Sequence, residues 1–118
     1  MIEGQIVLVP FPYIESDEIK LRPAVLLKQL PNTYEDWLLC MITTKLHQEI
    51  KDLDIIIDDE DVDFKASGLK QKSLIRVSRL AIVNKDQIPG ILGNISVERL
   101  GNIKTKLINW INPSHKIT

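Results

Sequence analysis

The chain has 118 residues, of which 44% are hydrophobic and 26% are charged, and its formal net charge is −1. This length fits one domain with a modest core, and the composition is typical of a folded globular protein rather than a disordered one. We therefore expect a single domain over residues 1–118. With one cysteine, Cys40, the chain forms neither an intrachain disulfide nor a multi-cysteine metal site.

Charge is unevenly distributed along the chain. Residues 49–63 hold eight acidic residues and one lysine, whereas residues 65–79 hold five basic residues and no acidic one. The near-neutral total gives no overall reason to expect nucleic-acid binding, but a local positive field attracts a polyanion. No signal-peptide pattern is evident, and no apolar run approaches the roughly 18 residues of a membrane span. We expect a cytoplasmic protein without a membrane segment.

The first half of the chain predicts three strands, over residues 2–9, 24–28 and 36–43, where β-branched and apolar side chains dominate. Pro10 and Pro12 are expected to end the first strand, because proline has no N–H to donate to a sheet. Between the first two strands the chain is polar and charged, which indicates a surface loop.

The second half predicts short strands over residues 54–58, 73–77 and 80–83, then a helical turn over residues 87–92. A longer helix is predicted to begin after Ser96, a good N-cap residue, because apolar residues then recur at helical spacing. These elements indicate a mainly β fold with a C-terminal α-helix, a small and partly open β-barrel with the helix packed across it.

The most specific pattern lies between residues 4 and 27. It consists of the apolar run GQIVLVPFP, a short polar loop, and KLRPAVLL, in which Arg22-Pro23 leads a second apolar run. This pattern resembles the MazF/PemK family of type II toxins. The resemblance implies an SH3-like barrel, shared with CcdB-type toxins, and the activity of an mRNA interferase, a small cytosolic endoribonuclease that is neutralised by a partner antitoxin.

Arg22 is the first candidate catalytic residue. Its guanidinium is a rigid fork of five donors that stays charged and suits bidentate contact with a phosphate. The structural alternative is an arginine that bonds loop carbonyls or the carboxylates of Glu15, Asp17 or Glu18. Thr43 follows the apolar third strand, and the resemblance implies that it works with Arg22 in RNA cleavage; Thr44 is the second candidate at this strand end.

Further residues are predicted to bind RNA. The resemblance implies a role for Ser73, which opens a strand after a glycine-containing loop. Arg76 and Arg79 follow on that strand, and arginines attract phosphates and stack on unpaired bases; the alternative is a solvated basic face. The complete predicted RNA-binding set is Lys20, Thr44, Lys45, Ser73, Arg76 and Arg79.

No metal or cofactor site is predicted. Asp59, Asp61 and Asp63 alternate like the opening of a calcium loop, but Phe64 and Lys70 stand where such a loop needs glycine and glutamate. We expect a solvated acidic loop instead.

The resemblance implies metal-independent cleavage of single-stranded RNA, in which the 2′-hydroxyl attacks the adjacent phosphorus. The expected partners are single-stranded RNA, an antitoxin with an acidic C-terminal segment, and a second copy of the chain in a homodimer. The alternative is a non-catalytic binding protein on the same fold, either a CcdB-like topoisomerase poison or a degenerate member that only binds its antitoxin.

Overall fold

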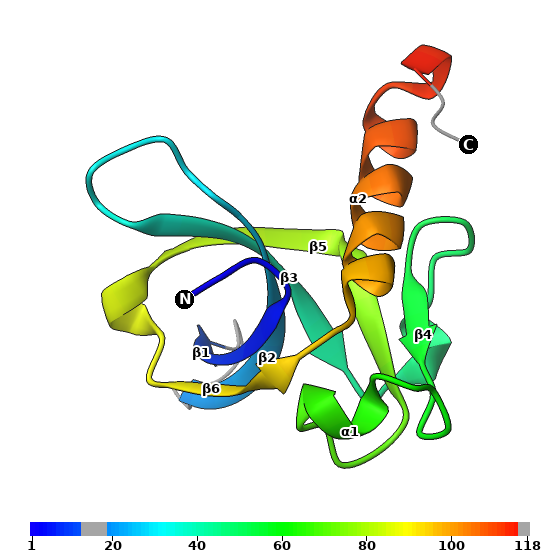
Figure 1. The fold of residues 1–118 in the computed structure, drawn as a ribbon, viewed down its shortest axis with the longest axis horizontal. Coiled ribbons are helices and arrows are strands. Elements are labelled where there is room, and N and C mark those ends of the chain that lie inside the picture. Colours follow the sequence, from blue (N-terminus) through cyan, green and yellow to red (C-terminus); the bar gives the residue numbers. More distant parts are fainter. Residues whose placement is uncertain (13–18, 116–118) are drawn as a thin grey trace.

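The computed structural model describes residues 1–12 and 19–115. One curled sheet of six antiparallel strands, in the order β4-β5-β3-β2-β1-β6, dominates the fold (Figure 1). The strands are β1 (Gln5–Pro12), β2 (Ile19–Gln29), β3 (Asp36–Thr43), β4 (Ile55–Ile57), β5 (Ser73–Asn84) and β6 (Gly90–Asn94). The predicted mainly β fold with a C-terminal helix is confirmed.

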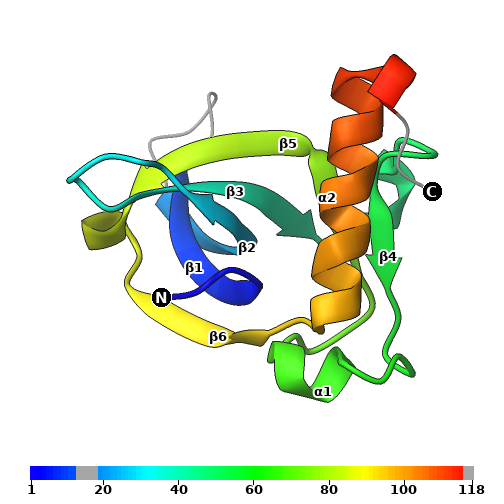
Figure 2. The ribbon, with the colours of Figure 1, turned by 45° about the horizontal axis from the view of Figure 1, so that its top comes forward.

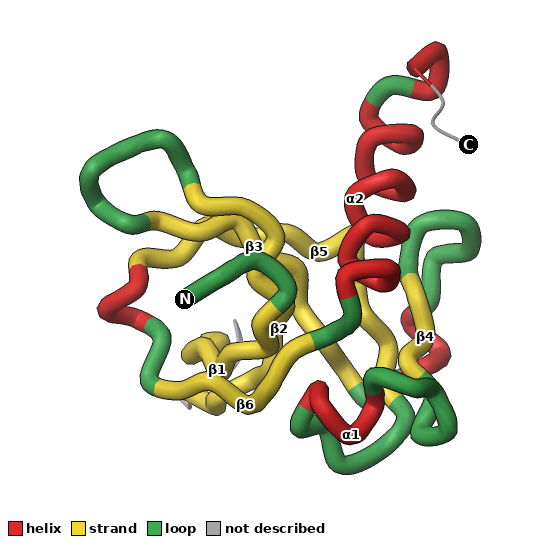
Figure 3. The backbone as a smooth tube through the Cα atoms, in the orientation of Figure 1, coloured by secondary structure: helices red, strands yellow, loops and turns green. Residues whose placement is uncertain are grey.

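Two helices and three short 3-10 turns complete the described chain (Figure 3). They are α1 (Phe64–Ser67), α2 (Val97–Ile111), η1 (Leu46–Gln48), η2 (Lys85–Gln87) and η3 (Pro113–His115). Helix α2 lies between the curled part of the sheet and β4 (Figure 2). Among the described residues, no helix is long and apolar enough to cross a membrane.

The sheet is buried on both faces over its central strands. Successive side chains of a strand point to opposite faces, so Val25 and Cys40 belong to one apolar cluster while Leu26 and Leu39 belong to a second. Ile103 of α2 is fully buried in the first cluster, so the helix covers that face. The apolar strand over residues 36–43 is thus buried on both faces.

The predicted ends of the strands differ from the structure around β1. Pro10 does not end the strand, which runs on to Pro12; the two prolines pair with Leu21 and Ile19 of β2. The other neighbour, β6, pairs only with residues 5–8 of β1. Proline is tolerated in a strand where its missing N–H faces no partner strand, and this part of β1 is such an edge.

Two other predictions are wrong. Residues 87–92 do not form a helical turn, because residues 90–94 pair with β1 as strand β6. The two strands predicted over residues 73–77 and 80–83 are one strand, β5, with a kink where its pairing with β3 slips. Two predicted elements begin where they are expected. Strand β3 has the predicted bounds, and the Ser96 hydroxyl caps α2 by accepting the N–H of Arg99 at 3.1 Å.

Helix α1 was not predicted, and it packs closely on β6. A Cβ added at Gly93 would lie 2.0 Å from the carbonyl oxygen of Ala66. Gly68 ends α1 with a φ of 75°, and a Cβ there would lie 2.3 Å from the carbonyl oxygen of Leu92. This contact between two backbones requires glycine at both positions, and it sets the loop that follows Gly68 beside β6.

A buried ion pair joins the start of α2 to the acidic connection before α1. Asp63 accepts hydrogen bonds from the Nε and Nη2 of Arg99 at 2.8 and 3.0 Å, and from the Ser96 N–H at 3.0 Å. Arg99 also donates to Asp61 at 2.8 Å. These hydrogen bonds, above all those from Arg99, lower the pKa of Asp63 to about 2.

Candidate functional site

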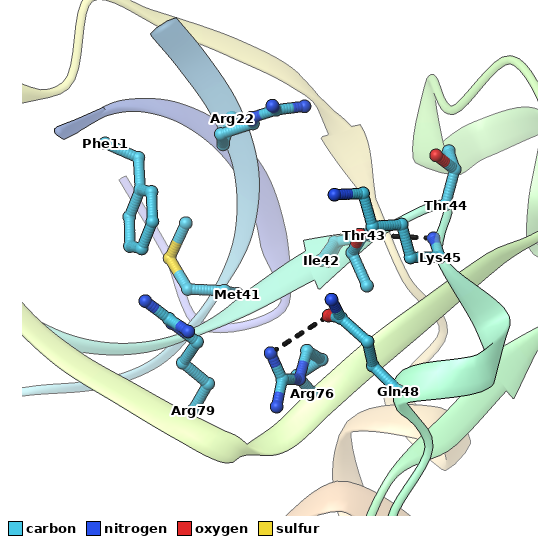
Figure 4. Close-up of a pocket in the computed structure, with 10 residues that line it drawn as sticks. All are labelled: Phe11, Arg22, Met41, Ile42, Thr43, Thr44, Lys45, Gln48, Arg76 and Arg79. Carbon is cyan, nitrogen blue, oxygen red and sulfur yellow. Dashed lines mark hydrogen bonds between the residues drawn. The ribbon is translucent and has the colours of Figure 1, made fainter. Parts of the chain in front are cut away.

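Two adjoining pockets open on the molecule, with volumes of about 150 and 350 Å³. Both are lined by Arg22, Ile42, Thr43 and Thr44, so these residues mark their junction. The smaller one, which we call the basic pocket, is also lined by Phe11, Met41, Lys45, Gln48, Arg76 and Arg79 (Figure 4). The larger one, the loop pocket, is also lined by Leu8, Pro23, Gly68, Leu69, Lys70, Gln71, Ser73 and Leu92.

Arg22 and Thr43 come from neighbouring strands of the sheet. Ala24 of β2 pairs with Met41 of β3. If this register is continued by two residues along each strand, Arg22 lies opposite Thr43. The two side chains are then on the same face of the sheet, because side chains two apart on a strand share a face. The structure thus brings together the two predicted catalytic residues, although they are 21 positions apart in the sequence.

Thr43 and Thr44 differ in their surroundings. Thr43 ends β3, is half-buried, and its hydroxyl oxygen accepts the backbone N–H of Lys45 at 3.2 Å. The N–H of Lys45 thereby holds the Thr43 side chain, while its hydroxyl hydrogen stays available as a donor. Thr44 is exposed.

Arg76 and Arg79 of β5 lie across the basic pocket from Arg22 (Figure 4). The Nη1 of Arg76 donates to the Oε1 of Gln48 at 3.1 Å, and its Nε is buried without a hydrogen-bond partner among the described residues. The guanidinium of Arg79 lies 4.6 Å from the centre of the Phe11 ring, as a cation–π pair. Gln48 was missed in the sequence, since a glutamine in a polar loop carries no pattern that points to a site.

The basic pocket is positive because of its lining. Arg22, Lys45, Arg76 and Arg79 line it, and no acidic side chain does so among the described residues. None of the described carboxylates of residues 49–63 lines either pocket. A chain of net charge −1 therefore has a concave, locally cationic surface, which attracts and holds an anion.

The remaining predicted residues lie in different positions. Ser73 lines the loop pocket but is 2% exposed, and its hydroxyl donates to the carbonyl of Gln71 at 2.8 Å. Lys20 lines neither pocket; it is exposed on β2, opposite Phe11. The acidic residues Glu15, Asp17 and Glu18, offered as alternative partners of Arg22, lie outside the described residues.

Cys40 carries no nucleophilic chemistry. It is fully buried, and burial, aided by the negative charge of Asp54, raises the pKa of its thiol to about 12. A thiol of that pKa is protonated at neutral pH and is not a nucleophile. The described residues contain no group of three or more histidine, cysteine and acidic side chains placed to hold a metal ion.

Comparison with known proteins shows the family. Residues 2–111 match the family described as PemK-like, MazF-like toxin of type II toxin-antitoxin system. Curated proteins give no match. Among solved structures, the fold is similar to that of an endoribonuclease in complex with its cognate antitoxin from a mycobacterial species, with 15% identity, a TM-score of 0.69 and 94% of each chain covered. It is also similar to the Mycobacterium tuberculosis toxin MazF-mt6, with 14% identity, a TM-score of 0.68, and 92% of this chain and 96% of that one covered. The chain belongs to the PemK-like, MazF-like toxins of type II toxin-antitoxin systems.

Proposed function

We propose that this toxin is an endoribonuclease that cleaves single-stranded RNA at the junction of the two pockets. The observation that carries the proposal is the meeting of Arg22 and Thr43, from two strands, in a pocket with three more cationic side chains. A fixed cation and a hydroxyl donor at one point suit a reacting phosphate, whose transition state gains negative charge. The fold's similarity to a protein described as an endoribonuclease supports the same activity.

The proposed reaction uses the ribose 2′-hydroxyl of the substrate. The 2′-oxygen loses its proton and attacks the adjacent phosphorus, while the bond from phosphorus to the 5′-oxygen breaks and that oxygen takes up a proton. The products end in a 2′,3′-cyclic phosphate and a 5′-hydroxyl. Arg22 stabilises the charge on the phosphate oxygens, and Thr43 donates its hydroxyl hydrogen to one of them.

Arginine side chains supply the positive charge in this scheme. We therefore expect cleavage to be independent of added metal. Single strands are the favoured substrates because their bases are unstacked and free to contact side chains such as the exposed Arg79. DNA lacks the 2′-hydroxyl and should not be cut.

The same surface suits an inhibitory partner. One structural neighbour is described in complex with its cognate antitoxin. We propose that an antitoxin with an acidic C-terminal segment neutralises this toxin by covering the basic pocket, since carboxylates and phosphates are recognised by the same arginines.

Replacing Arg22 tests the proposed activity. Arg22→Ala should lower the turnover of single-stranded RNA by about 100-fold or more, because one transition-state donor is typically worth this much. Arg22→Lys should recover only part of the loss, since lysine cannot form a bidentate contact. The matched control is Lys28→Ala on the same strand, whose exposed ammonium lies 3.6 Å from Glu3 and lines neither pocket.

The assay is gel analysis of the RNA products, with circular dichroism as the check on folding. Lys28→Ala should cleave at nearly the wild-type rate. A folded Arg22→Ala protein that does so too would remove Arg22 from the site.

A further inference from the structure

Strand β5 carries a kink at the edge of the basic pocket. Met41 of β3 pairs with Arg76, but the preceding residue of β3, Cys40, pairs with Leu80. Residues 77–79 therefore have no paired partner on β3. The pairing of β5 with β3 shifts by three residues, and because this is an odd number, it changes which side chains of β5 share a face.

The kink decides where Arg79 points. In an unbroken strand Arg79 would share a face with Val77, two residues before it. Val77 is fully buried in the apolar cluster under α2, so that face leads into the core. Instead Arg79 is exposed and lines the basic pocket together with Arg76. Two arginines three positions apart thus reach one pocket because the strand is kinked.

Asp54, the residue before β4, holds the middle of the kink. It is 4% exposed, and its carboxylate accepts the N–H of Ser78 at 3.0 Å and the Ser78 hydroxyl at 3.2 Å. It also accepts the N–H of Ile50 at 2.9 Å. A buried carboxylate satisfied by three donors is a rigid anchor, and the backbone N–H of Ser78 is one that β3 leaves unpaired.

We propose that Asp54 is a positioning residue for the RNA-binding site: through Ser78 it fixes the kink of β5 that brings Arg76 and Arg79 to the basic pocket. The inference rests on the proposed function, since it assigns the two arginines to a subsite for an RNA phosphate. It adds a residue that contacts no substrate and lines neither pocket.

An aspartate suits this role better than its amide. Three donors converge on the carboxylate, which has acceptors only. In Asp54→Asn the amide NH₂ would face one of these donors, so at least one hydrogen bond is broken and the kink loosens. The substitution nearly preserves the volume of the side chain, so it perturbs packing little.

Whether Asp54→Asn strengthens or weakens RNA binding distinguishes a positioning role of Asp54 from a purely electrostatic one. Removing a negative charge near a polyanion site should strengthen binding. We expect the opposite for Asp54→Asn: roughly 10-fold weaker binding of a 2′-deoxy-substituted, uncleavable RNA, with a salt slope shallower by about 0.7 for each phosphate that the protein no longer binds. The matched control is Asp52→Asn, the same change at an exposed residue of the same loop, with a φ of 69° that asparagine tolerates.

A combined variant tests whether Asp54 acts through the two arginines. In the background Arg76→Gln with Arg79→Gln, Asp54→Asn should not weaken RNA binding any further, because the groups that it positions are gone. An equal weakening in both backgrounds would overturn the proposal. Should Asp54→Asn fail to fold, Ser78→Ala removes only the hydroxyl contact, and a smaller weakening that again disappears in the double-arginine background is expected.

One readout does not need RNA. In the wild-type protein, Arg79 lies over the Phe11 ring, so ring currents should shift the NMR signals of its side chain. Asp54→Asn should abolish this shift and Asp52→Asn should keep it. A shift that persists in Asp54→Asn overturns the positioning proposal. If the shift disappears in Asp54→Asn but the wild-type protein neither binds nor cuts RNA, only the proposed function is overturned.

Discussion

Thr43 and Thr44 both line the junction of the two pockets, but within the described part of the chain only the Thr43 side chain has a hydrogen bond to the backbone, from the N–H of Lys45. A donor that is already oriented loses less freedom when it binds a transition state. We therefore expect Thr43→Ala to lower the turnover of RNA by about 10-fold to 100-fold, within the usual range for one positioned hydrogen-bond donor.

Thr44→Ala is the matched control for this prediction, because it makes the same change one residue away. It should lower turnover severalfold at most, as measured by initial rates at saturating RNA. The reverse order of the two variants would show that Thr44 is the residue that acts on the phosphate.

Arg22 and Thr43 are candidates from the sequence because they lie at the Arg-Pro start of one apolar run and the end of another, and because the resemblance to MazF/PemK toxins gives both a role; the structure places both at the junction of the two pockets. Gln48 and Asp54 could not be predicted. Their contacts are with Arg76 and Ser78, 28 and 24 positions away. Nothing local marks a residue whose role depends on a contact at such separation, and a buried aspartate within an acidic run looks like the solvated residues around it.

At the level of the elements, the start of α2 is tied to the acidic connection by the ion pair of Asp63 and Arg99. The pKa of Asp63 is lowered to about 2, mainly by its hydrogen bonds from Arg99. A carboxylate whose pKa is lower in the folded than in the unfolded protein stabilises the fold above its unfolded pKa, about 4, and loses this effect as pH falls toward about 2. The pair should contribute about 2 to 3 kcal/mol at neutral pH by this linkage.

Asp63→Asn should lower the free energy of unfolding at pH 7 by about 3 kcal/mol, because it leaves the guanidinium of Arg99 partly unpaired. The difference from the wild type should shrink as pH falls from about 4 to about 2, since the wild-type carboxyl is then protonated too. Urea denaturation at several pH values measures both effects. Glu60→Gln, an exposed acid in the same connection, should change stability by less than about 0.5 kcal/mol; a pH-independent loss in Asp63→Asn would contradict the linkage.

The elements themselves were predictable to different degrees. Residues 36–43 form a nearly continuous apolar run, and the helix after Ser96 has regular apolar spacing and an N-cap residue; the structure confirms both elements. Strand β6 has the sequence GILGN, which alternates weakly, and it is a strand because β1 is available to pair with it. Likewise, the prolines of β1 are tolerated only because β6 stops short of them. Such outcomes depend on the neighbouring strand and not on the segment alone.

For the whole molecule, we expect a homodimer. Large apolar side chains are exposed on the β1–β2 side and on β6; among them are Ile19, Leu21 and Ile91, each more than half exposed. Exposed apolar side chains in such numbers are typical of surfaces that associate. Sedimentation at micromolar concentration should give twice the mass of the chain, and a single species with the 13.5 kDa mass of one chain would contradict the expectation.

The charge of the whole molecule is consistent with the proposed substrate despite its near-neutral sum. The described acidic residues of the 49–63 segment line neither pocket, so their carboxylates do not neutralise the positive charge that an anion in the basic pocket would contact. The cationic lining and the junction with Thr43 support the proposed reaction, in which the substrate's own 2′-hydroxyl attacks the phosphorus.

The most direct test of that outcome is mass spectrometry of the products formed by the wild-type protein from a single-stranded RNA, with EDTA present. We expect fragments that end in a 2′,3′-cyclic phosphate and fragments that begin with a 5′-hydroxyl. We also expect no cut at that bond once the 2′-hydroxyl of its nucleotide is replaced by hydrogen. Products with a 3′-hydroxyl and a 5′-phosphate, cleavage of the deoxy-substituted bond, or a reaction that EDTA stops and magnesium restores would contradict the proposed chemistry.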